Sequence, residues 1–322
     1  MDNERPHCFV RNDLGRRFFA EALGTYIFVI CVVGCLAQII LGSRETFLAG
    51  EAPNFFVVTV GEGIGLALGM YVASGTSGGH INPAVSFVFA ILGNLTWKQL
   101  LVHWIAQYLG AFAACCSVYA VYADAHYHFI QGATDYEVKA AGSIYATASQ
   151  PSATWLACLV NVMSNSALFM LVFLAVNDKR GMFGHKSHIP GLAGLLLTLI
   201  GLSFGLLGGS AINPARDISG RIFSVLLGWD FLIDNHSNKA WFWMPALIPH
   251  LGMLIGAALY YLFVGNHWPP NESAEPESNP EVPDRRSKTD FNDELEGIIL
   301  VRNNTIQQKR TVFTRNVKIK KR

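Results

Sequence analysis

The tetrapeptide Ile-Asn-Pro-Ala occurs twice in this chain, and each copy follows a long apolar run. The first copy lies in 77–87 (SGGHINPAVSF) and the second in 208–221 (GGSAINPARDISGR). In both copies, small residues that permit tight turns precede a proline that suits the first turn of a helix. The sequence therefore predicts two short helices that begin at equivalent places, at Pro83 and Pro214.

Long apolar runs surround the two motifs. Hydrophobic residues make up 51% of the 322 residues and charged residues 15%, and the charges gather between the runs. This pattern is typical of a protein that crosses a membrane several times. The predicted spans are 18–41, 54–74, 99–122, 154–176, 189–207 and 242–264. The motif helices are predicted over 84–92, which is too short to cross and is expected to be re-entrant, and over 215–227.

The order span, span, motif helix, span occurs twice, over 18–122 and 154–264. Because each half has three full spans, the second half enters the membrane from the opposite side, as in an inverted repeat. The predicted fold class is an all-α membrane protein with six transmembrane helices and two re-entrant half-helices. The loop 123–153 is expected to be an ordered surface loop.

Basic residues orient this arrangement. Lys and Arg concentrate in 1–17, in 177–188 and at the end of the chain, whereas the loops expected on the other side carry few. By the positive-inside rule, both termini are predicted to be cytoplasmic. The domains are then a cytoplasmic N-terminus (1–17), a channel domain (18–264) and a disordered cytoplasmic tail (265–322). Asn235 begins an acceptor triplet in an outer loop and is a candidate for glycosylation.

Several partners and activities are not expected. The net charge of +1 gives no reason to expect a nucleic acid partner. The six cysteines lack the paired spacing of a zinc site, so neither a metal nor a cofactor is predicted. The chain shows no nucleophile and base pair and no phosphate-binding loop, which argues against an enzyme.

The two motifs together suggest a path through the membrane. If the motif loops enter from opposite faces, their half-helices point positive dipole ends at one spot, where Asn82 and Asn213 supply amide donors. Such a lining suits passive conduction of small neutral solutes that form hydrogen bonds, and it repels cations. The residues predicted to line the path with backbone carbonyls are Gly78, Gly79, His80, Gly208, Gly209 and Ala211.

Along 18–264 the chain resembles the major intrinsic protein family, the aquaporins, and more closely its aquaglyceroporin branch. The resemblance rests on 21–25 (EALGT), on 77–85, and on Asn213-Pro214-Ala215-Arg216-Asp217, which matches Asn82-Pro83-Ala84 of the first motif. Asp217 directly after the arginine is a signature of the glycerol-conducting branch. The resemblance implies a channel for glycerol, water and other small neutral solutes in the plasma membrane, assembled as a homotetramer with one pore in each subunit.

The resemblance also implies a selectivity filter at Glu62, Gly201, Ser210 and Arg216. Gly201 stands where a water-selective relative would have histidine, and its missing side chain is expected to leave width. Arg216 is expected to donate hydrogen bonds to solutes and to repel cations. Glu62 and Ser210 depart from the family, which usually has an aromatic residue at the first position, so this filter is expected to be polar.

Two hypotheses remain open for Glu62. It pairs with Arg216 and makes conduction pH-dependent, or it holds backbone amides of a loop, as the family's glutamates in the first and fourth spans do. Glu21 matches the first of these glutamates, but Asn161 occupies the position of the second. His80 is likewise either a pH-sensitive gate or a neutral side chain that holds its loop.

One alternative function comes from another class of protein. Inverted repeats, broken helices and an intramembrane glutamate also describe proton-coupled secondary transporters. Saturable uptake that depends on a proton gradient would distinguish a transporter from a channel.

Overall fold

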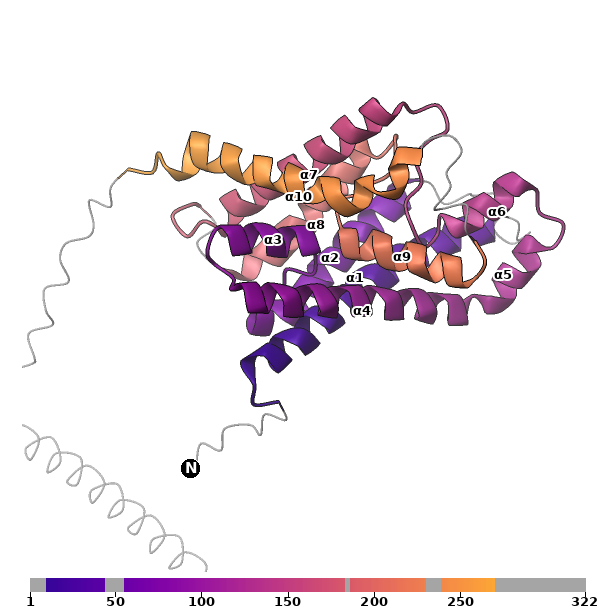
Figure 1. Cartoon of the computed structure of the whole chain (residues 1–322), viewed down its shortest axis with the longest axis horizontal. Coiled ribbons are helices and arrows are strands. Elements are labelled where there is room, and N and C mark those ends of the chain that lie inside the picture. The colour runs from indigo at the N-terminus through magenta and orange to yellow at the C-terminus, as the bar shows by residue number, and fades with distance from the viewer. Residues whose placement is uncertain (1–9, 44–54, 183–185, 230–238, 270–322) are drawn as a thin grey trace, which may run out of the picture. The chain divides into compact units, whose positions relative to one another are not determined.

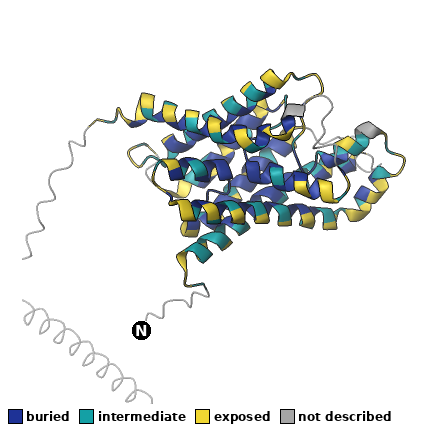
Figure 2. Ribbon diagram, viewed as in Figure 1, coloured by how far each residue is buried: buried dark blue, intermediate teal, exposed yellow. Residues whose placement is uncertain are grey.

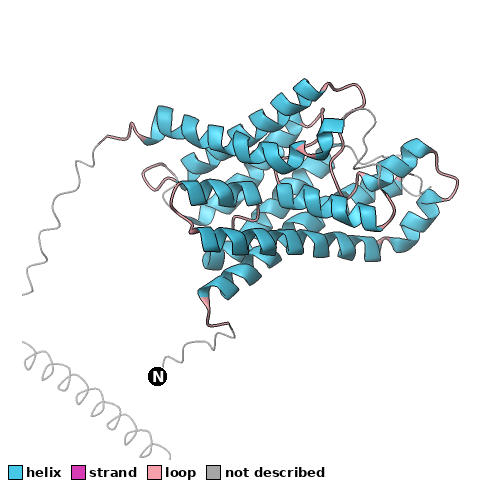
Figure 3. Ribbon diagram, in the orientation of Figure 1, coloured by secondary structure: helices cyan, strands magenta, loops and turns pink. Residues whose placement is uncertain are grey.

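The computed structural model describes residues 10–43, 55–182, 186–229 and 239–269. All of these residues except Pro269 belong to one compact unit that ends at Trp268. Within these residues every regular element is a helix, and no strand occurs (Figure 3). Six of the described helical segments are long and apolar enough to cross a membrane. The predicted all-α fold with six spans is therefore confirmed.

The spans and the motif helices lie close to their predicted positions (Figure 1). The long helices are α1 (Asp13–Gly42), α2 (Phe55–Ser77), α4 (Trp97–Val121), α7 (Trp155–Asn177), α8 (Ile189–Phe204) and α10 (Met244–Tyr260), which continues as a π-helical turn over Tyr261–Gly265. The short helices that follow the motifs are α3 (Pro83–Ile91) and α9 (Pro214–Leu226).

Three helix ends lie three or more residues from the prediction: α2 ends at Ser77 rather than at residue 74, and the start of α1 and the end of α8 also differ. Helix α1 begins at Asp13 rather than at residue 18, because the side chain of Asn12 accepts a hydrogen bond from Leu14 N and caps the helix. The charged first turns extend the helix beyond its apolar run. Helix α8 ends at Phe204, before the predicted residue 207, where the chain turns toward the second motif.

The long loop after α4 contains two short helices that were not predicted, α5 (Ala123–Ile130) and α6 (Asp135–Gly142). A reciprocal capping box between Thr134 and Glu137 fixes the start of α6. His126 on α5 is 1% exposed, although a surface position was expected. Its Nε2 lies 2.8 Å from the Tyr145 hydroxyl. The loop is thus ordered, as predicted, and its buried apolar residues join the main core of the helix bundle.

The long helices surround the two short ones. Helix α1 packs against α2 and α4, α7 packs against α10, and α2 meets α8. The α2–α8 contact is close: a Cβ at Gly63 would lie 2.4 Å from Gly194 O, so only glycine fits there. In Figure 1, α3 and α9 run away from a common point between α4 and α10. This arrangement agrees with the predicted inverted repeat.

Exposed residues lie on the outward faces of the long helices, and buried residues fill the centre (Figure 2). Many of the exposed residues are large and apolar. On α4, for example, Leu101, Ile105 and Leu109 are each more than half exposed and are spaced four residues apart. Such a stripe on one helix face is the surface that lipid tails cover in an integral membrane protein.

Candidate functional site

The two motif asparagines begin the short helices and also join the two motif loops, 78–82 and 208–213. Asn82 Oδ1 accepts from Ala84 N at 2.9 Å, and Asn213 Oδ1 accepts from Ala215 N at 3.1 Å. The amide nitrogens cross over: Asn82 Nδ2 donates to Ile212 O at 3.1 Å, and Asn213 Nδ2 donates to Ile81 O at 2.9 Å. Since each amide nitrogen carries two hydrogens, one remains for a solute.

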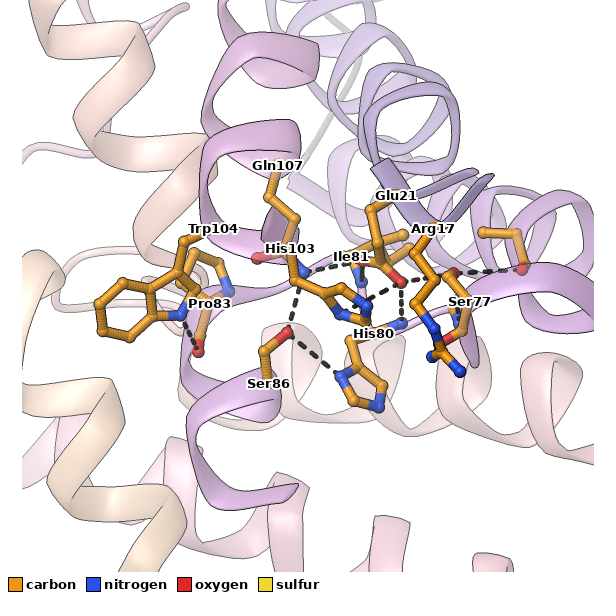
Figure 4. Close-up of polar contacts among 12 residues, drawn as sticks. Arg17, Glu21, Ser77, His80, Ile81, Pro83, Ser86, His103, Trp104 and Gln107 are labelled. Atoms are coloured by element: carbon orange, nitrogen blue, oxygen red, sulfur yellow. Dashed lines mark hydrogen bonds and ion pairs between the residues drawn. The ribbon is translucent and has the colours of Figure 1, made fainter. Parts of the chain in front are cut away.

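A buried carboxylate holds the first motif loop (Figure 4). Glu21 of α1 is fully buried and accepts from His80 N at 3.0 Å, Ile81 N at 2.7 Å and the Ser77 hydroxyl at 2.6 Å. Ile81 has a φ of 41°, a conformation that β-branched residues rarely adopt. The expectation that Glu21 holds loop amides is therefore confirmed, and the carboxylate fixes an unusual turn.

Helix α4 completes this network with residues that the sequence analysis did not select. Gln107 Nε2 donates to Glu21 Oε2 at 2.8 Å and lies 3.0 Å from the Ser86 hydroxyl. His103 Nδ1 lies 3.7 Å from Glu21 Oε1. The His80 ring contacts Ser86 Oγ at 3.2 Å, as expected if His80 holds its loop. The sequence offered one signal for this network: His103 and Gln107 are polar residues four positions apart on an otherwise apolar helix, α4.

The second motif loop is held differently. A Cβ at Gly208 would lie 2.1 Å from the Trp241 ring, so this loop packs tightly on a buried indole. The Ser210 hydroxyl donates to Glu62 Oε2 of α2. Asn161 donates to Phe204 O at 2.9 Å, at the end of α8. Neither Asn161 nor Glu62 accepts a backbone amide of this loop, so among the described residues no carboxylate repeats the role of Glu21 here.

Two cavities lie in line along the helices that carry the motifs. The larger has a volume of about 510 Å³, and we call it the vestibule; its wall includes Lys139, Thr147 and Trp241. The smaller has about 10 Å³, roughly the room that one water molecule needs, and contains both motif asparagines. The residues that line both cavities are Glu62, Ser210 and Arg216. These three therefore form the constriction between the cavities.

Glu62 and Arg216 face the constriction without pairing. Each is 6% exposed, and their charged atoms form no ion pair within 4.0 Å, so the structure does not contain the Glu62–Arg216 pair that one of the two hypotheses for Glu62 supposed. Glu62 instead accepts the hydrogen bond from Ser210. Arg216 Nη1 has no hydrogen-bond partner and lies 3.6 Å from Asp217 Oδ1.

Gly201 does not widen the path in the expected way. It lines neither cavity, and a Cβ at this position would lie 2.7 Å from Thr59 Cγ2. The absent side chain makes room for Thr59, which lines the vestibule. Among the predicted carbonyl positions, His80, Gly208, Gly209 and Ala211 line a cavity, whereas Gly78 and Gly79 line neither.

Asp217 ties the vestibule wall to α9. Its Oδ2 accepts from Arg221 Nε at 2.6 Å, and its Oδ1 accepts from Thr147 N at 2.8 Å. Arg221 Nη2 in turn donates to Thr147 O at 2.7 Å. Asp217, the residue that matches the signature of the glycerol-conducting branch, therefore connects α9 to the loop after α6. We call this connection the brace. Asn235, the candidate glycosylation site, lies outside the described residues.

Comparisons with known proteins agree with this geometry. The family model described as "Major intrinsic protein" matches residues 9–263. The chain is 38% identical to aquaporin-10 of Milnesium tardigradum over 81% of its length, spanning 65% of that relative. It is 33% identical to human aquaporin-9, covering 84% of this chain and 89% of the relative. The crystal structure of the aquaglyceroporin from Plasmodium falciparum is similar, with a TM-score of 0.66 and 27% identity over 78% of this chain and 96% of that one.

Proposed function

Because the chain belongs to the major intrinsic protein family, whose members are membrane channels and not enzymes, we propose that it conducts glycerol, water and other small neutral solutes passively. The observation that carries the proposal is the pair of crossed hydrogen bonds from Asn82 and Asn213. They bring two helix N-termini together at the narrow cavity, where a solute meets amide donors and the positive ends of two helix dipoles.

A solute passes three environments in order. It loses part of its hydration in the vestibule, meets the constriction of Glu62, Ser210 and Arg216, and then reaches the two asparagines. Beyond the constriction, apolar side chains such as Phe169 and Leu197 face the motif loops across the narrow cavity. Carbonyls and amides on one side and apolar side chains on the other suit a solute that has hydroxyl groups along a carbon chain.

Cations are expected to be rejected by the same geometry. The guanidinium of Arg216 faces the constriction, and the N-termini of α3 and α9 add partial positive charge at the asparagines.

The branch and the cellular setting are parts of the proposal. Asp217 and the likeness to an aquaglyceroporin support glycerol as a substrate. The distribution of Lys and Arg supports cytoplasmic termini, with the vestibule facing outward. Location in the plasma membrane and assembly as a homotetramer are proposed from family likeness.

Reconstitution of the full chain into liposomes tests the proposal. Stopped-flow light scattering after an osmotic step is expected to show glycerol and water flux above that of empty liposomes. The glycerol flux should rise in proportion to its gradient and ignore a proton gradient. A flux that saturates at low glycerol and stops when the proton gradient is dissipated would instead identify a secondary transporter. Nothing in the comparisons favours that alternative.

A pH-sensitive filter is a separate part of the proposal. Glu62 is a titratable group that lines the constriction, and Arg216 is the nearby group whose charge acts on it. If Glu62 changes its protonation state, glycerol flux should vary with external pH. The profile should be flat for Glu62→Gln, and an identical profile in both proteins would reject the gate.

A further inference from the structure

The vestibule is much larger than the cavity that follows it. Its volume of about 510 Å³ lies in the range of cavities that bind drug-sized ligands, whereas the narrow cavity has about the room that one water molecule needs. An aromatic ring is wider than the carbon chain of glycerol. A compound that carries such a ring therefore fits the vestibule but is expected to stop before the narrow cavity, where it would block the path.

The described residues that line the vestibule are of two kinds. Helices α1 and α2 supply apolar side chains, and α6 and the segment after it supply polar ones. The apolar set is Val32, Leu36, Phe55 and Val58, and the polar set is Lys139, Ser143, Thr147, Ser149 and Gln150. A cavity with apolar surface and a few polar groups suits a ligand of the same mixed character. The lining thus favours a ligand with an apolar body and one polar group.

The charges at the vestibule indicate the sign of that polar group. Lys139, Arg216 and Arg221 line it, and Glu62 is the carboxylate among its described lining residues. The carboxylate of Asp217 lies 2.6 Å from Arg221 Nε and 3.6 Å from Arg216 Nη1, so it serves both guanidinium groups. Three positive charges are therefore balanced by two negative ones. The excess of positive charge favours an anion.

Lys139 carries the charge that these carboxylates leave unmatched. It lies on α6 and is exposed, and no ion pair joins it to a described carboxylate. Because its ammonium group keeps much of its hydration, a pair with this group adds only modest affinity. Burial of an apolar body against α1 and α2 must supply the rest, so a small anion without such a body is not expected to be retained.

We propose that the vestibule binds organic anions whose apolar body is about as large as one aromatic ring, and that the bound anion blocks conduction. The carboxylate or sulfonate group lies toward Lys139, and the ring packs on the apolar side chains of α1 and α2. This inference rests on the proposed channel function and adds a class of blocking ligand to it. Glycerol has neither the charge nor the apolar body, so this site does not retain it.

Four compounds of graded chemistry test the proposal. 4-Methylbenzenesulfonate has both the charge and the ring, and its sulfonate stays ionised. Methanesulfonate keeps the charge without the ring, 4-methylbenzenesulfonamide keeps the ring without the charge, and benzyltrimethylammonium reverses the charge. Each is equilibrated at equal ionic strength on both sides of liposomes that contain the full chain, and glycerol flux is measured by stopped-flow light scattering. Only 4-methylbenzenesulfonate is expected to reduce the flux, by about half at a concentration on the order of 10 mM.

Variants of Lys139 test the charge, and each is compared with its own flux in the absence of the anion. For Lys139→Gln, the concentration of 4-methylbenzenesulfonate that halves the flux should rise about fivefold, as expected for the loss of one partly exposed charge pair. Lys139→Arg keeps the charge and should stay within about twofold of the wild type. The matched control is Lys98→Gln, which replaces an exposed lysine of α4 that lines neither cavity. Its half-blocking concentration should equal that of the wild type.

The outcomes separate the anion site from the channel function. If the wild type conducts glycerol and 4-methylbenzenesulfonate leaves the flux unchanged, the site is overturned while the channel stands. The same holds if methanesulfonate or the neutral sulfonamide blocks as strongly, or if the wild type and Lys139→Gln have the same half-blocking concentration. A wild type that conducts no glycerol above empty liposomes would overturn the channel function, and the proposed block with it.

Discussion

The two motif loops share a sequence and a helix start but not a support. The first loop is held by a buried carboxylate, Glu21, which accepts hydrogen bonds from backbone amides of the loop and from the Gln107 side chain on α4. The second loop is held by packing on Trp241 and by side-chain hydrogen bonds from Ser210 to Glu62 and from Asn82 to Ile212 O. The first loop is therefore anchored by a buried carboxylate, whereas the second rests on an indole and on single hydrogen bonds.

The largest effect should follow from removing the anchor of the first loop. Glu21→Ala leaves the buried His80 and Ile81 amides and the Gln107 amide without their acceptor, at a cost on the order of 4 kcal/mol. We expect a large loss of folded protein, measured by thermal unfolding and size-exclusion chromatography in detergent. An unfolding temperature like that of the wild type would contradict the role of Glu21.

The counterpart in the second half provides the control for this comparison. Asn161 donates one hydrogen bond, to Phe204 O. Asn161 also accepts from Asn165 Nδ2 at 3.3 Å, so Asn161→Ala should cost about 2 kcal/mol, the usual worth of two hydrogen bonds. Equal losses for Asn161→Ala and Glu21→Ala would show that the two loops are supported alike, against the structure.

A somewhat smaller effect is expected at the brace of the vestibule. Asp217→Asn keeps the shape of the side chain but removes the negative charge between Arg216 and Arg221, which are both buried. Breaking such a pair leaves buried cations uncompensated and should cost about 3 kcal/mol. Thermal unfolding in detergent measures the loss, and Asp217→Glu, which keeps the charge, should recover part of it.

Acid should weaken the loop that bears α5 and α6. Burial lowers the pKa of His126 to about 4, below the value of about 6.5 that it has when unfolded. Below pH 6.5 the unfolded chain therefore binds more protons, and stability falls until the pH reaches the folded pKa. Between pH 7 and pH 5 the loss should be on the order of 2 kcal/mol.

His126→Phe is the test variant for this pH effect. It keeps an aromatic ring against Tyr145 and Trp229 but cannot be protonated. Thermal unfolding at pH 7 and pH 5 should show a smaller difference for the variant than for the wild type. An equal difference would assign the acid sensitivity to other groups.

The smallest effect is expected for the hydroxyl that holds Glu62. Ser210→Ala removes one hydrogen bond but leaves the carboxylate in the constriction. Glycerol flux should change by no more than about threefold, measured by stopped-flow light scattering on liposomes. A much larger loss of flux would show that the hydroxyl itself is needed for conduction.

The sequence was sufficient for the spans because their length and apolar content leave few alternatives. It was also sufficient for the short helices, because each begins at an Asn-Pro pair that suits a cap. The helices α5 and α6 were missed because they are short and carry no long apolar period. Thr134-x-x-Glu137 was a usable signal for the start of α6, since this spacing forms a capping box.

The sequence could indicate which residues lie near the constriction, but not which of them form hydrogen bonds with one another. Glu62, Ser210 and Arg216 do meet, yet spacing could not show that Ser210 rather than Arg216 would bind the carboxylate. The prediction that Gly201 widens the path did not account for a neighbour. Thr59 occupies the space that a side chain at residue 201 would need. His103 was missed because a single histidine on an apolar helix gives no sign of the carboxylate that it approaches from another helix.

The crossed bonds of Asn82 and Asn213 bear on how the chain matures. Each asparagine donates to a carbonyl in the other half, so neither motif loop can complete its hydrogen bonds until both halves have entered the membrane. Since chains are made from the N-terminus, the first half must wait for the second. The pore and its narrowest point then arise in one late step, and a half-made chain has no finished path through which the membrane could leak.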